Sequence, residues 1–500
     1  MASLRPRLAV ALLALAGPAV AGDPHAVHGV DFRVHCTAAV RGDFDRALAL
    51  LHHMTYPQAR SAFVAIGQAD PKCAMAYWGE AMTLFQPLWP TRPSLAERER
   101  GWKAVQQARD LAPKDPRERA FVDMAAAFFE TPASDDYWAR IVRWDAATRR
   151  VLDAFPQDDE ARAFRALALL ATAPADRVSR DHADQAAALL QQVLAHDPDH
   201  PGAMHYLVHA NDVPGREKES PANTRGYEAI APDNPHALHM PTHVYTRIGD
   251  WDGVVRGNLR AADAALRYPA GEHGEYVWDE YAHAIEYLVY GYLQQGDIAH
   301  ARTQRDRLLA TKHLQPSFKQ AFHLASVQAR IPLETQDWKA AAALVPRSPA
   351  TVDWDKFPWP EAIAQFAHGM GAAHSDRVDD AKVASARISA LEAKMAAAKE
   401  TLFERNIRIL RLELDATIAQ AESRTREAIA LAEQAITLER ETPKHPVTPA
   451  PTLPAEELLG DLYVAQGRSA KARDAYTRAL ARYPNRLAPQ RALRALDAPR

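Results

Sequence analysis

The sequence is poor in cysteine, in strand-forming patterns and in charge of one sign. Among 500 residues there are two cysteines, and the charged residues leave a net charge of −3. Alternation of Val, Ile and Thr with polar residues, which is typical of strands, is nearly absent. Motifs of a phosphate-binding loop, a nucleophile elbow or a cysteine metal cluster are missing. These shortages argue against a β-sheet fold and a serine or cysteine nucleophile, and the balanced charge predicts no nucleic-acid partner.

Long apolar runs are also missing, except near the N-terminus. There, Arg5 and Arg7 precede an apolar run over residues 8–16, and the small residues 19–21 fit the rule for signal-peptide cleavage. We predict a signal peptide over residues 1–21, cleaved near Ala21, and export to the periplasm or out of the cell. An uncleaved anchor is disfavoured because the run is short for a bilayer. No later segment is long and apolar enough to span a membrane.

The two cysteines are Cys36 and Cys73. In an exported protein, two cysteines are most simply explained by a single disulfide, so we expect these two to be bonded. The alternative is a pair of buried thiols.

Helix-forming residues and a repeating pattern are what the sequence does contain. Alanine-rich stretches at 123–129, 183–194 and 384–399 favour helix. The clearest repeat, near the C-terminus, has these landmarks: Leu459, Gly460, Tyr463, Gly467, Ala472, Tyr476, Ala479 and Pro484. Their identities and offsets are those of the tetratricopeptide pattern, in which small residues allow close helix packing and aromatic residues fill the seam.

Looser copies of the same pattern occur along the chain, which therefore resembles the tetratricopeptide-repeat superfamily over residues 44–484. The resemblance implies an all-α, tetratricopeptide-like α-solenoid, a right-handed superhelix of antiparallel helix pairs. We divide the chain into this solenoid at 22–442, a proline-rich linker at 443–454, and a C-terminal repeat with a capping helix at 455–500. Segments 70–79, 205–212 and 236–245 further resemble a group of exported bacterial tetratricopeptide proteins, with which we associate no established activity.

Two His-x-x-x-His pairs mark the candidate site. His205 and His209 form one pair and His239 and His243 the other, and residues four apart share one face of a helix. Both pairs occupy the inner positions of successive repeat units, whose helices pack about 8–10 Å apart. We therefore expect one centre of four imidazoles, with Asp212 as an oxygen ligand or as the partner of a ring nitrogen. Such a centre would suit Zn or Cu.

Further side chains are expected to line the concave groove of the solenoid. The residues at its inner positions are His52, Glu160, Arg247, His283, Glu286, Tyr290, Arg330 and His374. Arg247 and Arg330 could hold an anionic ligand, but pairing with Asp or Glu is the simpler interpretation. Pro241 lies between His239 and His243, where it removes a helical hydrogen bond and either kinks the helix or delays its start.

Three functions remain open from the sequence. The first is an exported binding protein that holds a peptide or small molecule at a histidine-centred, metal-loaded site in the groove. The second is a metal-dependent enzyme that uses the same centre, with Glu286 or Glu160 as acid or base. The third is a protein–protein interaction scaffold without metal, in which the histidines are structurally satisfied.

Overall fold

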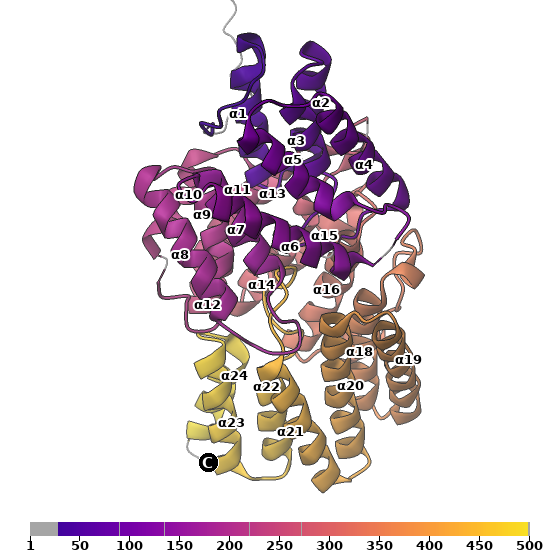
Figure 1. Ribbon diagram of the computed structural model, residues 1–500. Coiled ribbons are helices and arrows are strands. Elements are labelled where there is room, and N and C mark those ends of the chain that lie inside the picture. The colour runs from indigo at the N-terminus through magenta and orange to yellow at the C-terminus, as the bar shows by residue number, and fades with distance from the viewer. Residues whose placement is uncertain (1–28, 90, 135, 220, 272, 499–500) are drawn as a thin grey trace, which may run out of the picture.

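Helices follow one another along nearly the whole chain in the computed structural model, which describes residues 29–89, 91–134, 136–219, 221–271 and 273–498 (Figure 1). The predicted signal peptide lies outside these residues. The helices are α1 (Ala38–His52), α2 (Tyr56–Ala69), α3 (Ala74–Met82), α4 (Leu95–Asp110), α5 (Pro116–Phe129), α6 (Tyr137–Ala154), α7 (Asp159–Ala171), α8 (Asp181–His196), α9 (Pro201–Asn211), α10 (Pro221–Ile230), α11 (Pro235–His239), α12 (Pro241–Ile248), α13 (Trp251–Ala265), α14 (Asp279–Gln295), α15 (Ile298–Ala310), α16 (Phe318–Glu334), α17 (Trp338–Ala342), α18 (Pro358–Ala373), α19 (Val378–Ala397), α20 (Thr401–Ala421), α21 (Thr425–Glu441), α22 (Ala455–Ala465), α23 (Ser469–Arg482) and α24 (Leu487–Asp497), with a 3-10 turn η1 (Trp354–Lys356). In the described part of the chain the only strands, β1 (Pro269–Ala270) and β2 (Tyr276–Val277), pair antiparallel, with Pro269 opposite Val277.

Helices that follow each other in the chain pack against each other, as α13 does with α14 and α20 with α21. The C-terminal pair shows why the pattern specifies this packing. A Cβ atom placed on Gly460 of α22 would lie 2.3 Å from the ring of Tyr476 on α23, so only glycine allows the two helices to come this close. The predicted all-α solenoid of helix pairs is confirmed.

Polar caps begin many of the helices. Ser94 and Glu97 form a capping box at the start of α4, and each side chain bonds the backbone N–H of the other. Asn234 accepts from the backbone N–H groups of His236 and Ala237 at the start of α11. Its amide nitrogen also donates to Thr55 Oγ1 at 2.7 Å, which fixes the start of α11 beside the start of α2.

Residues 443–454, which we call the strap, connect α21 to α22 without forming a helix. The linker assigned to this segment is not a free spacer, because most of its side chains are buried. Figure 1 shows it as a gold loop that rises from between α21 and α22 toward α14. Arg330 of α16 donates to Thr448 Oγ1 at 2.9 Å and to the carbonyl oxygens of Ala450 and Pro451 at 2.7 and 2.9 Å.

The C-terminal repeat also contacts the middle of the chain. The indole nitrogen of Trp251 donates to the carbonyl oxygen of Asn485 at 2.9 Å, across 234 residues of sequence. Arg486, which is fully buried, donates to the hydroxyl of Tyr290 at 2.9 Å. These contacts bring the turn between α23 and α24 against α13 and α14.

The predicted disulfide is present, with Cys36 bonded to Cys73 at the start of α3. It ties the extended segment before α1 to the second helix pair. Among the residues that the model describes, no helix has the length and apolar character that crossing a membrane requires.

Candidate metal centre

Four helices carry the histidines of the candidate site. Helix α9 supplies His205 and His209, α11 supplies His236 and His239, α12 supplies His243, and α14 supplies His283. The break at Pro241 does not separate His239 from His243, because Met240 between α11 and α12 keeps right-handed helical dihedral angles. The ring centroids of these two histidines lie 4.9 Å apart.

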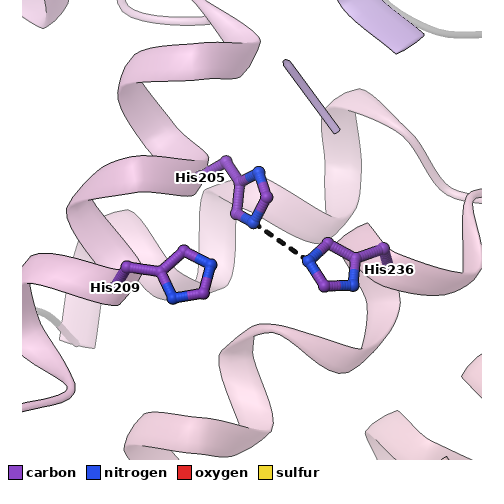
Figure 2. A group of neighbouring side chains, drawn as sticks. All are labelled: His205, His209 and His236. Atoms are coloured by element: carbon purple, nitrogen blue, oxygen red, sulfur yellow. Dashed lines mark hydrogen bonds between the residues drawn. The ribbon is translucent and has the colours of Figure 1, made fainter. Parts of the chain in front are cut away.

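The first histidine group consists of His205, His209 and His236, whose rings turn toward one another (Figure 2). Nδ1 of His205 lies 2.6 Å from the carbonyl oxygen of His52, which can only accept, so this nitrogen carries the hydrogen. Nδ1 of His236 lies 2.9 Å from a carboxylate oxygen of Glu280 and donates in the same way. The Nε2 atoms of both rings therefore present lone pairs, and they lie 3.1 Å apart. Nε2 of His209 is buried and has no hydrogen-bond partner among the residues that the structure describes.

The second histidine group consists of His239, His243 and His283. Nδ1 of His239 donates to Asn258 Oδ1 at 2.6 Å, and Nδ1 of His243 donates to Asp212 Oδ2 at 2.8 Å. Their Nε2 atoms face each other at 2.9 Å. The hydroxyl of Tyr287 lies 3.4 Å from Nε2 of His243.

A relay of hydrogen bonds fixes the tautomer of His283. Glu286 accepts from Nδ1 of His323 at 2.5 Å, so Nε2 of His323 is an acceptor. That Nε2 atom lies 3.1 Å from Nδ1 of His283, which donates to it. His283 is therefore left with its own Nε2 lone pair free, like the other members of the second histidine group.

The nitrogen separations fit two ligands of one ion. Two nitrogens at about 2.0–2.1 Å from a metal ion lie roughly 2.9–3.3 Å apart when the angle at the metal is between 90° and 109°. The separations of 3.1 and 2.9 Å fall in this range. Two unshared lone pairs at such distances repel unless a cation lies between them, and the outer nitrogens are held by carbonyl, amide or carboxylate oxygens, as in metal-bound histidines.

The imidazoles are neutral, which is the form that binds metal. Burial, followed by repulsion from a neighbouring imidazole, holds the pKa well below its ordinary value in His205, His236, His239 and His283. Burial also lowers the pKa of His209 to about 3. Burial lowers the pKa of His243 as well, although its bond to Asp212 opposes this effect.

A third cluster, of His52, Glu160 and His200, does not need an ion. Glu160 accepts from Nε2 of His52 at 2.9 Å and from Nε2 of His200 at 3.0 Å. The remaining ring nitrogens bond the Tyr206 hydroxyl and the backbone N–H of Ala203. Burial acts to raise the pKa of Glu160, but the two imidazoles outweigh it and hold the pKa well below its usual range. Every ring nitrogen of this cluster has a partner, so we assign it a structural role.

The single centre of four imidazoles expected from the sequence is replaced by two groups of three. His205 and His209 belong to one group, and His239 and His243 to the other. The pairs separate because His236 and His283, from two other helical turns, complete the two sets. Asp212 binds the outer nitrogen of His243 and lies in neither group.

The other predicted groove residues surround this centre or lie away from it. Arg247 and Lys444 both bind Asp212, and Arg330 binds Glu286 at 3.0 Å, so both predicted arginines are paired with carboxylates. Tyr290 bonds Arg486. His374 does not reach the histidines: it is exposed at the end of α18, where its ring stacks on Trp338 at 3.9 Å.

Sequence reasoning missed His236, whose place beside Pro235 suggests a capping residue. It also missed Glu280 and Asn258, which orient rings of the two groups. One signal was available. His236 lies three residues before His239, so the two share a helix face, and His239 shares a face with His243 in turn. No signal of this kind marks His200, His323 or the strap residue His445, because each reaches the site from another part of the fold.

The strap covers the two histidine groups. A small cavity of about 20 Å³ is lined by His209 and His236 from the first group, by His243 and His283 from the second, and by the strap residues His445, Pro446 and Val447. A larger cavity of about 280 Å³ lies along the strap, and Arg247, Tyr290 and Lys444 are among its lining residues.

The sequence of residues 456–486 matches the family model described as a tetratricopeptide repeat. The C-terminal part of the chain therefore contains a tetratricopeptide repeat. The match covers α22, α23 and the turn that follows, where the sequence shows its clearest repeat. No curated protein matches the chain.

Solved structures similar to this protein include the human IFIT1 dimer with m7Gppp-AAAA. That likeness has 12% identity and a TM-score of 0.41, and it covers 87% of this chain and 94% of that one. The human IFIT1 dimer with PPP-AAAA is 13% identical, with a TM-score of 0.38 and coverage of 77% and 87%.

Proposed function

We propose that this tetratricopeptide-repeat protein is exported and binds transition-metal ions, Zn or Cu, at its two histidine groups. The observation that carries the proposal is the convergence of buried Nε2 atoms in two groups of three histidines, in five of which the opposite ring nitrogen donates to a protein acceptor. Imidazole nitrogen suits zinc and copper, and neither group includes the carboxylate or carbonyl oxygens that magnesium and calcium require.

The bound ions would serve ligand binding in the space beside the strap. The cavity of about 280 Å³ is near the lower end of the volumes of small-molecule sites, and it is lined by aromatic, proline and charged side chains. Arg247 and Lys444 line it and also hold Asp212, which orients His243. A peptide or small molecule there would therefore contact Arg247 and Lys444, which hold the carboxylate that orients a ring of the second histidine group.

A metal-dependent enzyme is the second candidate. Each group supplies three protein nitrogens, and three-ligand sets are typical of catalytic metal sites, which keep a coordination position for water or substrate. Glu286 remains the acid or base expected from the sequence, although it already bonds His323 and Arg330. Turnover of ester, peptide or phenolic substrates that requires the metal would favour this function.

Export is supported by two independent features. The first is the basic start, apolar run and small residues of the predicted signal peptide at 1–21. The second is the disulfide between Cys36 and Cys73, because such bonds persist in oxidising compartments. Amino-terminal sequencing of the protein isolated from its cells is expected to begin near Gly22.

Elemental analysis of the mature protein, purified without a histidine tag, tests metal binding. We expect stoichiometric Zn or Cu. Combined His209→Ala and His243→Ala substitutions remove one ligand from each group and are expected to abolish it. The matched control is His300→Ala, because this side chain is 61% exposed and lies outside both groups. Wild-type protein without metal after loading, or full metal content in the double variant, would refute the assignment and favour the scaffold.

A further inference from the structure

The two histidine groups are direct neighbours. His236 and His239 are three residues apart on α11, and one belongs to each group. Their ring centroids lie 6.3 Å apart, and those of His209 and His243 lie 6.2 Å apart. Helix α11 therefore holds one ligand of each group within a single turn, and an ion in one group would lie close to an ion in the other.

The two groups also share the small cavity beneath the strap. Its wall includes two histidines of each group, and its volume of about 20 Å³ is enough for one water-sized molecule. His445, Pro446 and Val447 of the strap close it from the other side. The space that both groups face therefore accepts a single small ligand and no larger one.

We propose that the two groups form one dinuclear copper centre, in which two Cu(II) ions share a bridging hydroxide in this cavity. This inference rests on the proposed metal binding and adds the number of ions, their identity and the ligand between them. Donor sets made only of imidazole bind Cu(II) most tightly among the first-row divalent ions. Paired ions that share one oxygen ligand are an established arrangement in proteins.

The charges around the centre favour an anionic bridge. Six neutral imidazoles bring no negative charge to the two ions, because the carboxylates of Asp212, Glu280 and Glu286 lie behind the rings and not among the ligands. Asp212 is further neutralised by Arg247 and Lys444. A hydroxide between the ions would therefore offset part of their positive charge, which the nearest protein groups leave uncompensated.

Copper content and electron paramagnetic resonance together test the pairing. The mature chain is purified without a tag, stripped with a chelator, loaded with Cu(II) at pH 7 and freed of excess copper. We expect two copper ions per chain but a resonance signal that accounts for less than a tenth of two spins. The reason is that the unpaired electrons of two hydroxide-bridged Cu(II) ions couple antiferromagnetically and cancel. Acid unfolding is expected to return both spins, which shows that the copper was not reduced.

Single substitutions separate the two ions. His236→Ala and His283→Ala each remove one ligand from one group, so each variant is expected to retain one copper ion with a full one-spin signal, whereas His300→Ala keeps two coupled ions. One copper per wild-type chain, or two copper ions with two full spins, would overturn the pairing and leave metal binding intact. Failure to bind copper or zinc at all would overturn the proposed function itself. The spin count of the unmodified chain decides the question even where a variant does not fold.

Discussion

Five of the six rings in the two histidine groups are oriented by a protein acceptor behind them, and His209 is the exception among the bonds of the described residues. The His-x-x-x-His spacing was enough to predict that His205 and His209, or His239 and His243, share a helix face. It could not predict which helix supplies the third ring, because that depends on how α9, α11 and α14 are turned relative to one another. It also gave no sign of Asn258 or His323, whose contacts form only when distant helices pack.

The acceptors Glu280 and Asp212 offer a reciprocal test at the residue scale. Glu280→Gln is expected to weaken metal binding at the first histidine group by about 10- to 100-fold, and Asp212→Asn to do so at the second, because loss of a carboxylate behind a ligand makes the imidazole a poorer donor. Metal titrations of both variants measure this. Each variant serves as the control for the other, and equal weakening of both sites by either one would contradict the assignment.

At the scale of elements, the helices were predictable and the strap was not. Caps such as Asn234 and close contacts such as Gly460 on Tyr476 are local features that the sequence displays. The prolines between α21 and α22 predict a linker, but proline-rich composition is the same in a free linker and in a packed segment. What makes the strap a packed segment is Arg330, which lies more than 110 residues earlier in the chain.

Arg330→Lys tests how the strap is held. Lysine keeps the positive charge beside Glu286 but cannot make the several directed hydrogen bonds that the guanidinium donates to the strap. We expect faster hydrogen exchange of the strap amides and faster loss of bound metal to a chelator, with unchanged metal content at equilibrium. Arg347→Lys, at an exposed ion pair with Asp355, is the matched control. Unchanged exchange in the strap would show that other contacts hold it.

The C-terminal repeat contains a carboxyl group that destabilises the fold at neutral pH. Burial raises the pKa of Asp461 to about 6, and the hydrogen bond from Tyr476 only partly opposes this effect. Since the folded-state pKa lies above the unfolded one, the group contributes most stability below about pH 4, and this contribution is lost as the pH rises through 6.

Asp461→Asn is therefore expected to raise the free energy of unfolding by about 1–2 kcal/mol at pH 8 and to change it little at pH 4. Asparagine keeps the acceptor for Tyr476 while removing the charge. Thermal unfolding of the variant across this pH range measures the effect, with the exposed Asp474→Asn as control. An equal gain at both pH values would mean that ionisation is not the cause.

At the scale of the whole molecule, the solenoid returns on itself, so that its last repeat contacts the helices of the site. Repeat landmarks predicted the series of helix pairs because each pair is a local unit. They could not predict the contact of Asn485 with Trp251, because a solenoid pattern describes neighbouring repeats only. The covalent link between Cys36 and Cys73 was predicted from the number of cysteines together with the expected export.

Loss of that disulfide tests how much the N-terminal segment contributes to the stability of the fold. The two cysteines are 37 residues apart, and closing such a loop in the unfolded chain is worth about 4 kcal/mol. Paired Cys36→Ser and Cys73→Ser substitutions are expected to lower the free energy of unfolding by up to this amount and to leave metal content unchanged. Denaturant unfolding measures the first and elemental analysis the second. Loss of metal in a folded variant would connect this segment to the site.

The wall of the small cavity begins at Leu88 and ends at Val447. About nine-tenths of the polypeptide must therefore leave the ribosome before the last piece of that wall has been made. The six histidines of the two groups are made long before that, so a growing chain holds these side chains without the strap that covers them. Anything held behind the strap can therefore be enclosed only when synthesis is nearly complete.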